Sequence, residues 1–182
     1  GARGPRAPGA TAGAGSAAAN EIDNTVAAYT TTSGGPDEHV ESSAGSISLS
    51  ATDSSRVTGI AGTVAVALGL KNAGSGATVA VAVGLSVVIN EIGHNGWHTI
   101  EAYIDAADVT AADDVSVIAG STATILALAA GGSASVAGSK GVSGVTGAFE
   151  VAGVVTSNTI AQTISARITG GSVVEATAGT AR

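Results

Sequence analysis

Two histidines and two glutamates gather between residues 91 and 101, and these side chains could do chemistry. His94 and His98 stand four residues apart, with Glu91 before them and Glu101 after them. On a helix this spacing would place both imidazoles on one face, where they could share a metal ion. The glycines inside the segment oppose a helix. We therefore expect an exposed insertion loop and predict no metal site.

Trp97 lies at the tip of the same segment and is the single tryptophan of the chain. An exposed indole offers a flat apolar face to a sugar ring or to a partner. Trp97, with His94 and His98 beside it, is therefore the candidate ligand contact. The alternative is that the indole folds back and plugs the loop locally.

A second polar group is the densest set of acidic residues, which could attract calcium. Its members are Asp105, Asp108, Asp113 and Asp114. The glycine-rich nonapeptide that binds calcium in β-rolls is absent, and the first copy of the repeat described below has no matching set. Aspartates that form turns are the favoured interpretation.

Catalysis is not expected, and we predict no catalytic residue and no cofactor. A hydrolase or lyase built on a β-helix needs grouped carboxylates, or lysine and arginine, in a cleft. The chain has only two lysines, both between apolar runs, and its arginines are scattered. Serine is abundant, but no histidine is placed to activate it.

The elements that would position these residues repeat with a period of about 68 to 70 residues. Asn20 begins an Asn-Glu-Ile triplet that returns at Asn90 and, degraded, at Asn158. The same alignment matches Tyr29 with Tyr103 and then with Arg167. It also matches three valines with one another: Val40, Val109 and Val173. Such an array buries each unit against its neighbours. A capping or turn role is expected for the three asparagines, and a continuous ladder does not follow from their spacing, because whole units separate them.

Within each repeat, apolar and small or polar residues alternate with a period of two, as in residues 78–83 and 115–117. This pattern predicts strands with one buried face. The fold class is therefore all-β, a parallel β-solenoid with inward Val, Ile, Leu and Ala. Rungs of about twenty residues would give eight or nine turns, roughly 40 Å tall at about 4.8 Å per rung. Val81 and Val117 are expected to face the core and Ser116 the solvent.

Two stretches admit another interpretation. Residues 115–139 carry no charge and are long enough to span a bilayer, although they are rich in Ser, Thr and Gly. Residues 122–130 are rich in Ala and Leu, which favour a helix. Strands fit both stretches better, and no membrane insertion is predicted.

Composition and charge exclude several classes of protein. Seven Lys and Arg stand against fourteen Asp and Glu, and no Lys or Arg occurs between Lys71 and Lys140. A nucleic-acid partner needs a clustered basic face, so none is predicted. Without cysteine, the chain has no disulfide scaffold and no thiolate metal site.

The expected organisation is a flexible Gly/Pro leader over residues 1–12 and a β-solenoid over residues 13–182. The solenoid would hold about two and a half repeat units, cut within a repeat at both ends. Open rungs of this kind are edges that pair with further strands. The expected partners are therefore copies of the chain, or adjoining repeats, joined end to end.

The run at residues 80–92, followed by residues 101–105, 109–111 and 114–117, resembles a repeat of very large bacterial surface proteins. These are haemagglutinin-like or autotransporter-like adhesins and giant exoproteins. The resemblance covers residues 13–182. It implies a right-handed parallel β-solenoid on a long stalk, exported to the cell surface or extracellular space. It also implies a structural rod segment of an adhesin or filament. The alternative is a glycan- or surface-binding module that uses the Trp97 loop.

Overall fold

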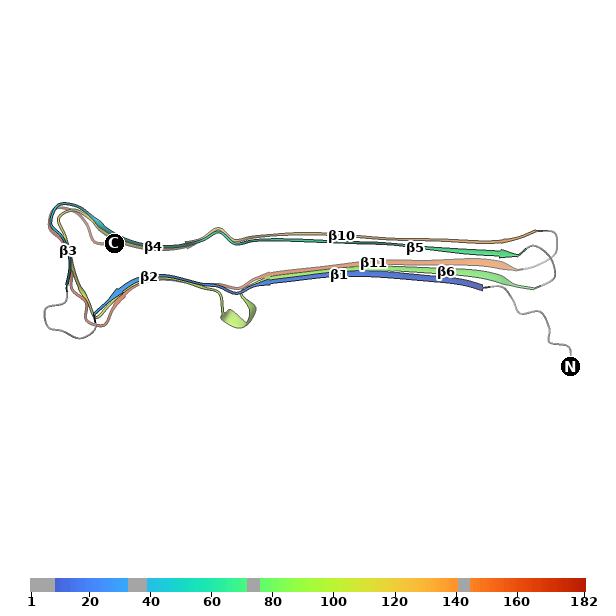
Figure 1. Ribbon diagram of the computed structural model, residues 1–182, viewed down its shortest axis with the longest axis horizontal. Coiled ribbons are helices and arrows are strands. Elements are labelled where there is room, and N and C mark those ends of the chain that lie inside the picture. Colours follow the sequence, from blue (N-terminus) through green and yellow to red (C-terminus); the bar gives the residue numbers. More distant parts are fainter. Residues whose placement is uncertain (1–8, 33–38, 72–75, 141–144) are drawn as a thin grey trace. The chain divides into compact units, whose positions relative to one another are not determined.

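The computed structural model describes residues 9–32, 39–71, 76–140 and 145–182, and strands occupy most of them (Figure 1). In chain order these are β1 (Gly9–Ile22), β2 (Thr25–Thr31), β3 (His39–Ser42), β4 (Ile47–Asp53), β5 (Arg56–Lys71), β6 (Thr78–Ile92), the short 3-10 helix η1 (His94–Gly96), β7 (Thr99–Asp105), β8 (Asp108–Ala111), β9 (Val115–Ser121), β10 (Thr124–Ser139), β11 (Thr146–Ile160), β12 (Thr163–Thr169) and β13 (Val174–Ala176). The sheets are β1-β6-β11, β5-β10, β2-β7-β12, β3-β8-β13 and β4-β9. The all-β class and the parallel β-solenoid are confirmed.

One coil of the solenoid is a whole repeat. Thr25 pairs with Thr99, 74 positions later, and Thr99 pairs with Thr163, 64 positions later, both in parallel register. The expected rung of about twenty residues is therefore wrong. Glycines inside the repeat, such as Gly62 and Gly69, do not end a strand. Both lie inside the 16-residue strand β5, where alternation continues without a break.

The register confirms most of the sequence alignment and corrects one position. Tyr29 pairs with Tyr103, which pairs with Arg167, as expected. Val109, however, pairs with Val174 and not with Val173. A slip of one residue exchanges the two faces of a strand, and Val173 is accordingly exposed.

The apolar stretch at residues 115–139 forms β9 and β10, so the helical interpretation of residues 122–130 is wrong. Among the described residues, no helix is long and apolar enough to cross a membrane. At the other end of the sequence, β1 begins at Gly9, four residues before the expected start of the solenoid. Residues 1–8 of the expected leader lie outside the described residues, and residues 9–12 belong to β1 and not to a flexible leader.

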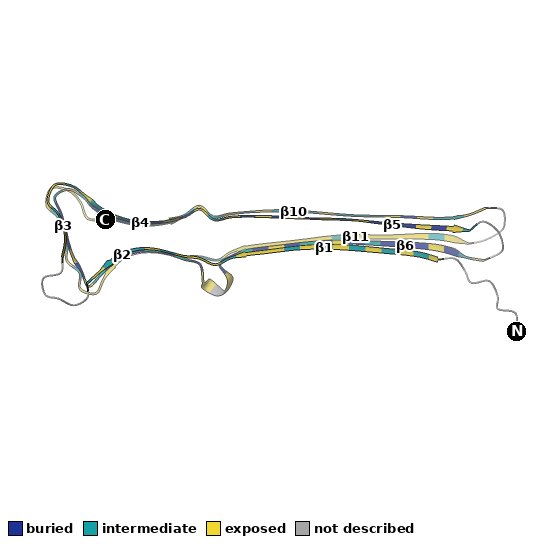
Figure 2. Cartoon of the chain, viewed as in Figure 1, coloured by how far each residue is buried: buried dark blue, intermediate teal, exposed yellow. Residues whose placement is uncertain are grey.

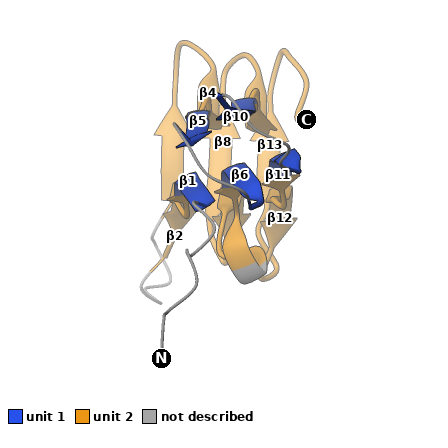
Figure 3. Cartoon of the chain, turned by 90° about the vertical axis from the view of Figure 1, so that its right-hand side faces the viewer, with its two compact units in different colours: residues 1–20, 58–90, 126–158 blue, residues 21–57, 91–125, 159–182 orange. Residues whose placement is uncertain are grey.

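The chain divides into two compact units that each collect segments from all three repeats (Figure 3). Unit 1 is Gly1–Asn20, Thr58–Asn90 and Leu126–Asn158, and unit 2 is Glu21–Val57, Glu91–Ile125 and Thr159–Arg182. Unit 1 contains most of the long strands β1, β5, β6, β10 and β11. Unit 2 contains the shorter strands and η1.

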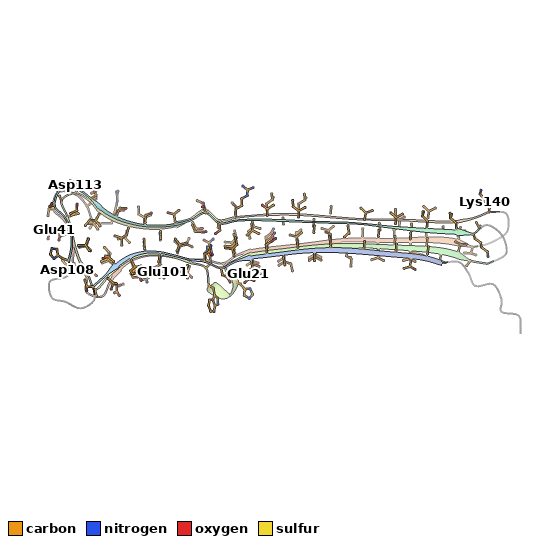
Figure 4. All side chains as sticks on the ribbon, viewed as in Figure 1. Glu21, Glu41, Glu101, Asp108, Asp113 and Lys140 are labelled. Atoms are coloured by element: carbon orange, nitrogen blue, oxygen red, sulfur yellow. The ribbon has the colours of Figure 1, made fainter. Side chains whose placement is uncertain are left out.

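Unit 2 has a conventional core. Ile100, Ile104 and Val109 are fully buried and belong to one apolar cluster with Val117. Charged side chains project from the other face of the same strands, as Glu101 does from β7 (Figure 4). Val117 therefore faces the core as expected. Ser116 does not face solvent, because it is buried to the same degree as Val117.

Unit 1 differs from unit 2 because small side chains fill its core and most of its large side chains lie outside. Its core cluster consists of alanines, among them Ala65, Ala67, Ala80 and Ala82. Along β6 the buried positions alternate with half-buried or exposed ones (Figure 2). Leu85 and most of the valines occupy the outer positions, and Val88 is the buried exception. Val81 is one of these outer residues, so its expected place in the core is wrong.

Small inner residues allow the two sheets of unit 1 to approach closely. A Cβ added at Gly59 on β5 would lie 2.5 Å from the Oδ1 atom of Asn90 on β6. The Thr63 hydroxyl donates a hydrogen bond to the Leu85 carbonyl oxygen at 3.1 Å, which ties β5 to β6. Glycine, alanine, serine and threonine therefore form most of this interior, because more large side chains would force the sheets apart. Val88 and Asn90, which are also buried, lie opposite Gly59, where no side chain competes for the space.

Candidate functional site

The exposed loop between β6 and β7 is the place where Trp97 meets solvent. Gly93 and Gly96 adopt positive φ angles of 85° and 80°, which bend the chain out of the strand and back. The Trp97 amide donates to the His94 carbonyl oxygen at 3.2 Å and closes the short turn η1. The Trp97 side chain is 71% exposed, so the indole does not plug the loop.

His94 lies in the same loop and is fixed by two acidic residues. Its Nδ1 atom lies 2.8 Å from a carboxylate oxygen of Glu91, and its backbone amide donates to Asp23 at 2.7 Å. The hydrogen bond to Glu91 raises the pKa of His94, and the nearby charges of Glu21 and Asp23 act in the same direction. Protonated His94 would therefore place a cation in the same loop as the exposed indole.

His98 does not join this surface, because its side chain is 0% exposed. The Asn24 backbone amide donates to the His98 Nδ1 atom at 3.3 Å, and the Nε2 atom lies 3.3 Å from an oxygen of Asp53. The structure thus separates His98 from Trp97 and His94. The candidate ligand contact on the surface therefore consists of Trp97 and His94 alone.

Asp53 is the centre of a buried polar cluster that the sequence analysis did not find. Its carboxylate accepts hydrogen bonds from the hydroxyls of Ser55 at 2.6 Å and Ser121 at 3.1 Å. Burial pushes the pKa of Asp53 upward, but the hydrogen bonds from Ser55, His98 and Ser121 outweigh it and lower the pKa. The repeat could have signalled this cluster, since Asp53 and Ser121 are paired across neighbouring coils.

The cluster contains Ser, His and Asp but lacks the arrangement of a nucleophilic triad. In a triad the histidine stands between serine and aspartate and accepts the serine proton. Here Asp53 stands between the serines and His98, and the Nδ1 atom of His98 already accepts a backbone amide. This geometry holds adjacent coils together and activates no hydroxyl.

Three of the four aspartates expected to form turns accept hydrogen bonds from the neighbouring coil, 64 to 66 residues later in the chain. Asp105 accepts from the Thr169 hydroxyl at 2.9 Å, and Asp108 accepts from the Val173 amide at 3.2 Å. Asp114 accepts from the Thr180 amide at 2.8 Å, and the backbone and hydroxyl of Thr180 lower its pKa. Within the described ranges, no group of three His, Cys, Asp or Glu side chains could hold a metal ion.

The three asparagines form a continuous ladder, contrary to expectation. The Asn20 Nδ2 atom donates to Asn90 Oδ1 at 2.8 Å, and Asn90 Nδ2 donates to Asn158 Oδ1 at 3.0 Å. A ladder would be impossible if one repeat spanned several rungs. Because one repeat is one coil, equivalent asparagines are direct neighbours, and the central Asn90 is 0% exposed.

A second ladder runs across the outer face of the β2-β7-β12 sheet. The rings of Tyr29 and Tyr103 stack at 5.1 Å with 7° between their planes, and the Arg167 guanidinium lies 4.4 Å from the Tyr103 centroid. Arg167 also forms a bidentate pair with Glu101, with N–O distances of 3.0 and 3.3 Å. The replacement of tyrosine by Arg167 therefore preserves the stack as a cation–π contact.

Comparison of the chain with family models, curated proteins and solved structures gives no match. The resemblance to bacterial surface proteins therefore depends on the sequence motifs alone. What the chain does must be inferred from its ladders, edges and exposed faces.

Proposed function

We propose that this chain is a structural rod segment of an extracellular adhesin or surface filament, and that its coils stack end to end on copies of itself or on adjoining repeats. In-register ladders of asparagine and of tyrosine and arginine support the proposal. Each ladder places like or complementary groups one coil apart, which is the arrangement that extends by adding coils. The proposed localisation is the cell surface, as the resemblance to bacterial surface proteins implies.

The strongest support for this proposal is the direction of the hydrogen bonds in the asparagine ladder, which leaves a donor at one edge and an acceptor at the other. At the β1 edge, Asn20 uses its amide nitrogen inside the ladder and keeps its Oδ1 atom available. At the β11 edge, Asn158 uses its Oδ1 atom and keeps its Nδ2 atom available. A second copy stacked head to tail would continue the ladder, with Asn158 donating to the next Asn20. Such a heterologous contact repeats without closing and yields a rod.

One residue on the β11 edge opposes stacking. Glu150 alternates in phase with Asn158 on β11, and its carboxylate accepts the Ser135 backbone amide at 2.8 Å. A carboxylate on an edge strand would be buried by an added coil, at a cost in free energy. Glu150 should therefore limit stacking at this edge.

The expected effect of Ala152→Pro is a loss of stacking. The Thr78 amide donates to Val145, so odd-numbered residues of β11 bond to β6 and the Ala152 amide points to the open edge. Proline there removes an edge donor without breaking an internal bond. Sedimentation velocity should show the wild-type chain growing in mass with concentration, and Ala152→Pro should stop the growth of long stacks.

Ala152→Ser, which keeps the amide, is the matched control and should associate like the wild type. Glu150→Gln should strengthen association several-fold, because no charge is then buried at the edge. A wild-type chain that keeps one small mass at every concentration, or an Ala152→Pro chain that still forms long stacks, would contradict the proposal.

A second candidate function is glycan binding at the loop, and the exposed Trp97 indole, in the same short turn as His94, favours it. Aromatic faces stack on sugar rings, and a protonated histidine would select acidic sugars. Because Glu91 raises the pKa of His94, the cation persists to a higher pH than usual, and affinity for an acidic glycan should fall once the pH exceeds that pKa.

Affinity electrophoresis through gels that contain a neutral or an acidic polysaccharide would test this candidate. Trp97→Ala should abolish any retardation, with a loss of about tenfold or more in affinity, as is common when a central aromatic contact is removed. Tyr29→Ala, which removes another exposed aromatic ring of unit 2, should leave the retardation unchanged. Equal retardation of wild type and Trp97→Ala would refute the candidate.

A further inference from the structure

The outward face of the β5-β10 sheet is a continuous apolar surface. Between Thr58 and Leu70 on β5, and between Leu126 and Ser139 on β10, there is no charged residue. The large residues of this face are exposed despite their size, as Leu68 is at 60%. The large exposed apolar residues of this face are Ile60, Val64, Val66, Leu68 and Leu70 on β5 and Leu126, Leu128 and Val136 on β10.

The same chain builds an ordinary polar surface elsewhere, so this face is not explained by composition alone. On β7 in unit 2 the large apolar residues Ile100 and Ile104 point inward, and Glu101 and Asp105 point outward. Among the described residues of unit 1, Glu150 is the one acidic residue, and it lies on β11 and not on this face. An uncharged apolar face of this extent in water is typical of an interaction surface.

We infer that this outward β5-β10 face docks against the same face of a second copy of the chain, in a two-fold symmetric pair. Each exposed Val, Leu or Ile leaves roughly 100 Å² of apolar surface in water. The eight large residues together offer on the order of 800 Å², which is about one partner's share of a standard protein interface. The face is therefore large enough for a stable dimer without further contacts.

The shape of the face also suits a second copy. A shallow hollow, lined by Gly62, Ala130 and Gly132, interrupts the rows of large side chains. In a face-to-face pair of sheets, ridges of one face fill such hollows in the other, and sheets pack in this way at about 10 Å. A two-fold axis brings the same surface to both sides, so one chain supplies both the ridges and the hollows.

A bilayer is a poorer occupant on the same observations. Segments that lie on membranes combine an apolar face with Lys or Arg and with Trp or Tyr near the interface. The described part of this face contains none of these residues between its ends, and the whole chain has a net charge of −7. An anionic surface would repel the chain, while an uncharged face meets its own copy without any charge penalty.

Leu68→Lys should separate this pairing from end-to-end stacking. The test is made in the Ala152→Pro chain, so that stacking does not contribute to the mass. Sedimentation velocity should then show a dimer as the largest species. Leu68→Lys should weaken the dimer at least tenfold, because each chain would then bury an unpaired lysine in an apolar interface. Thr31→Lys, an exposed change of equal charge on β2, should leave the dimer intact.

Cross-linking gives a second readout that does not depend on introducing a charge. The chain contains no cysteine, so Leu68→Cys creates a unique thiol. A flexible bifunctional maleimide, which does not require the two thiols to meet at the axis, should link most Leu68→Cys chains in pairs and few Thr31→Cys chains. A monomer at all concentrations, or a dimer unaffected by Leu68→Lys, would overturn the inference. Flotation of the wild type with phosphatidylcholine vesicles that is lost in Leu68→Lys would also overturn it, because lipid would then be the occupant.

The two proposals fail independently. If the Ala152→Pro chain no longer forms long stacks but still forms a dimer, both the lateral pairing and the end-to-end contact are supported. A wild-type dimer that never forms long stacks would support the lateral pairing and contradict the proposed rod. Long stacks in which Leu68→Cys does not cross-link would leave the rod proposal standing and refute the lateral pairing.

Discussion

Ala82→Asp is expected to unfold unit 1, whereas the same change at the neighbouring Val81 is expected to be mild. Ala82 is 0% exposed and packs in the alanine cluster with Ala80 and Ala65. An unpaired charge in such an interior costs about 3–5 kcal/mol. Val81 lies on the outer face, where a carboxylate stays hydrated, so we expect a loss of about 1 kcal/mol. Urea denaturation followed by far-ultraviolet circular dichroism would measure both free energies of unfolding.

The comparison is informative because residue size alone predicts the reverse order. Valine buries more apolar area than alanine, and a conventional core would therefore lose more when valine is replaced. If Val81→Asp proves the more damaging change, the larger side chains of β6 face inward and the described distribution in unit 1 is incorrect. The docking surface on the β5-β10 sheet would then be in doubt as well.

The strands could be predicted from the sequence, but their faces could be predicted only where charged residues mark one side, as on β7 of unit 2. On β7, Glu101 and Asp105 alternate with isoleucines, so charge alone marks the outer face of this strand. On β6, the alternating residues are valine and alanine, and both are apolar. A period of two then defines two faces without saying which one is buried. The close approach of the sheets decides this, and it depends on pairs of residues far apart in the sequence.

The length of the coil was unpredictable for a similar reason. Glycine marks turns in most strand proteins, and the same interpretation of the glycines in β5 divides the strand into short pieces. In this chain several of them, Gly59 and Gly69 among them, lie where one strand closely approaches another. Once one repeat is taken as one coil, the asparagine ladder and the pairing of Asp53 with Ser121 follow directly from spacings already visible in the sequence.

The candidate site was predicted in part. The loop and its indole were expected from Gly93, Gly96 and Trp97, and the structure exposes Trp97 as that interpretation requires. The burial of His98 was not predictable from the loop. It depends on Asp53, 45 positions earlier in the chain, whose carboxylate lies beside the imidazole inside unit 2. A histidine next to an exposed loop can equally belong to the core behind it.

Gly84→Val is expected to destabilise unit 1 strongly, because the glycine lies where the two sheets are closest. A Cβ at this position would collide with the Gly132 carbonyl oxygen of β10. Strand β10 is hydrogen-bonded to β5, so its backbone cannot move away alone. Overpacking of a core costs about 1–3 kcal/mol, and a clash with backbone belongs at or above the upper end. Thermal denaturation followed by circular dichroism should show a clearly lower Tm.

Gly13→Val is the matched control, since Gly13 lies on β1 with nothing within 4 Å of the added Cβ. Valine favours strands and glycine does not, so this variant should be neutral or more stable by up to about 1 kcal/mol. Equal effects of the two changes would mean that the sheets of unit 1 do not approach closely. The expected contrast explains the composition. In unit 1, glycine and alanine are frequent because the interior has little room for larger residues, and most of the large residues of this unit therefore lie on an outer face, where a second chain can cover them.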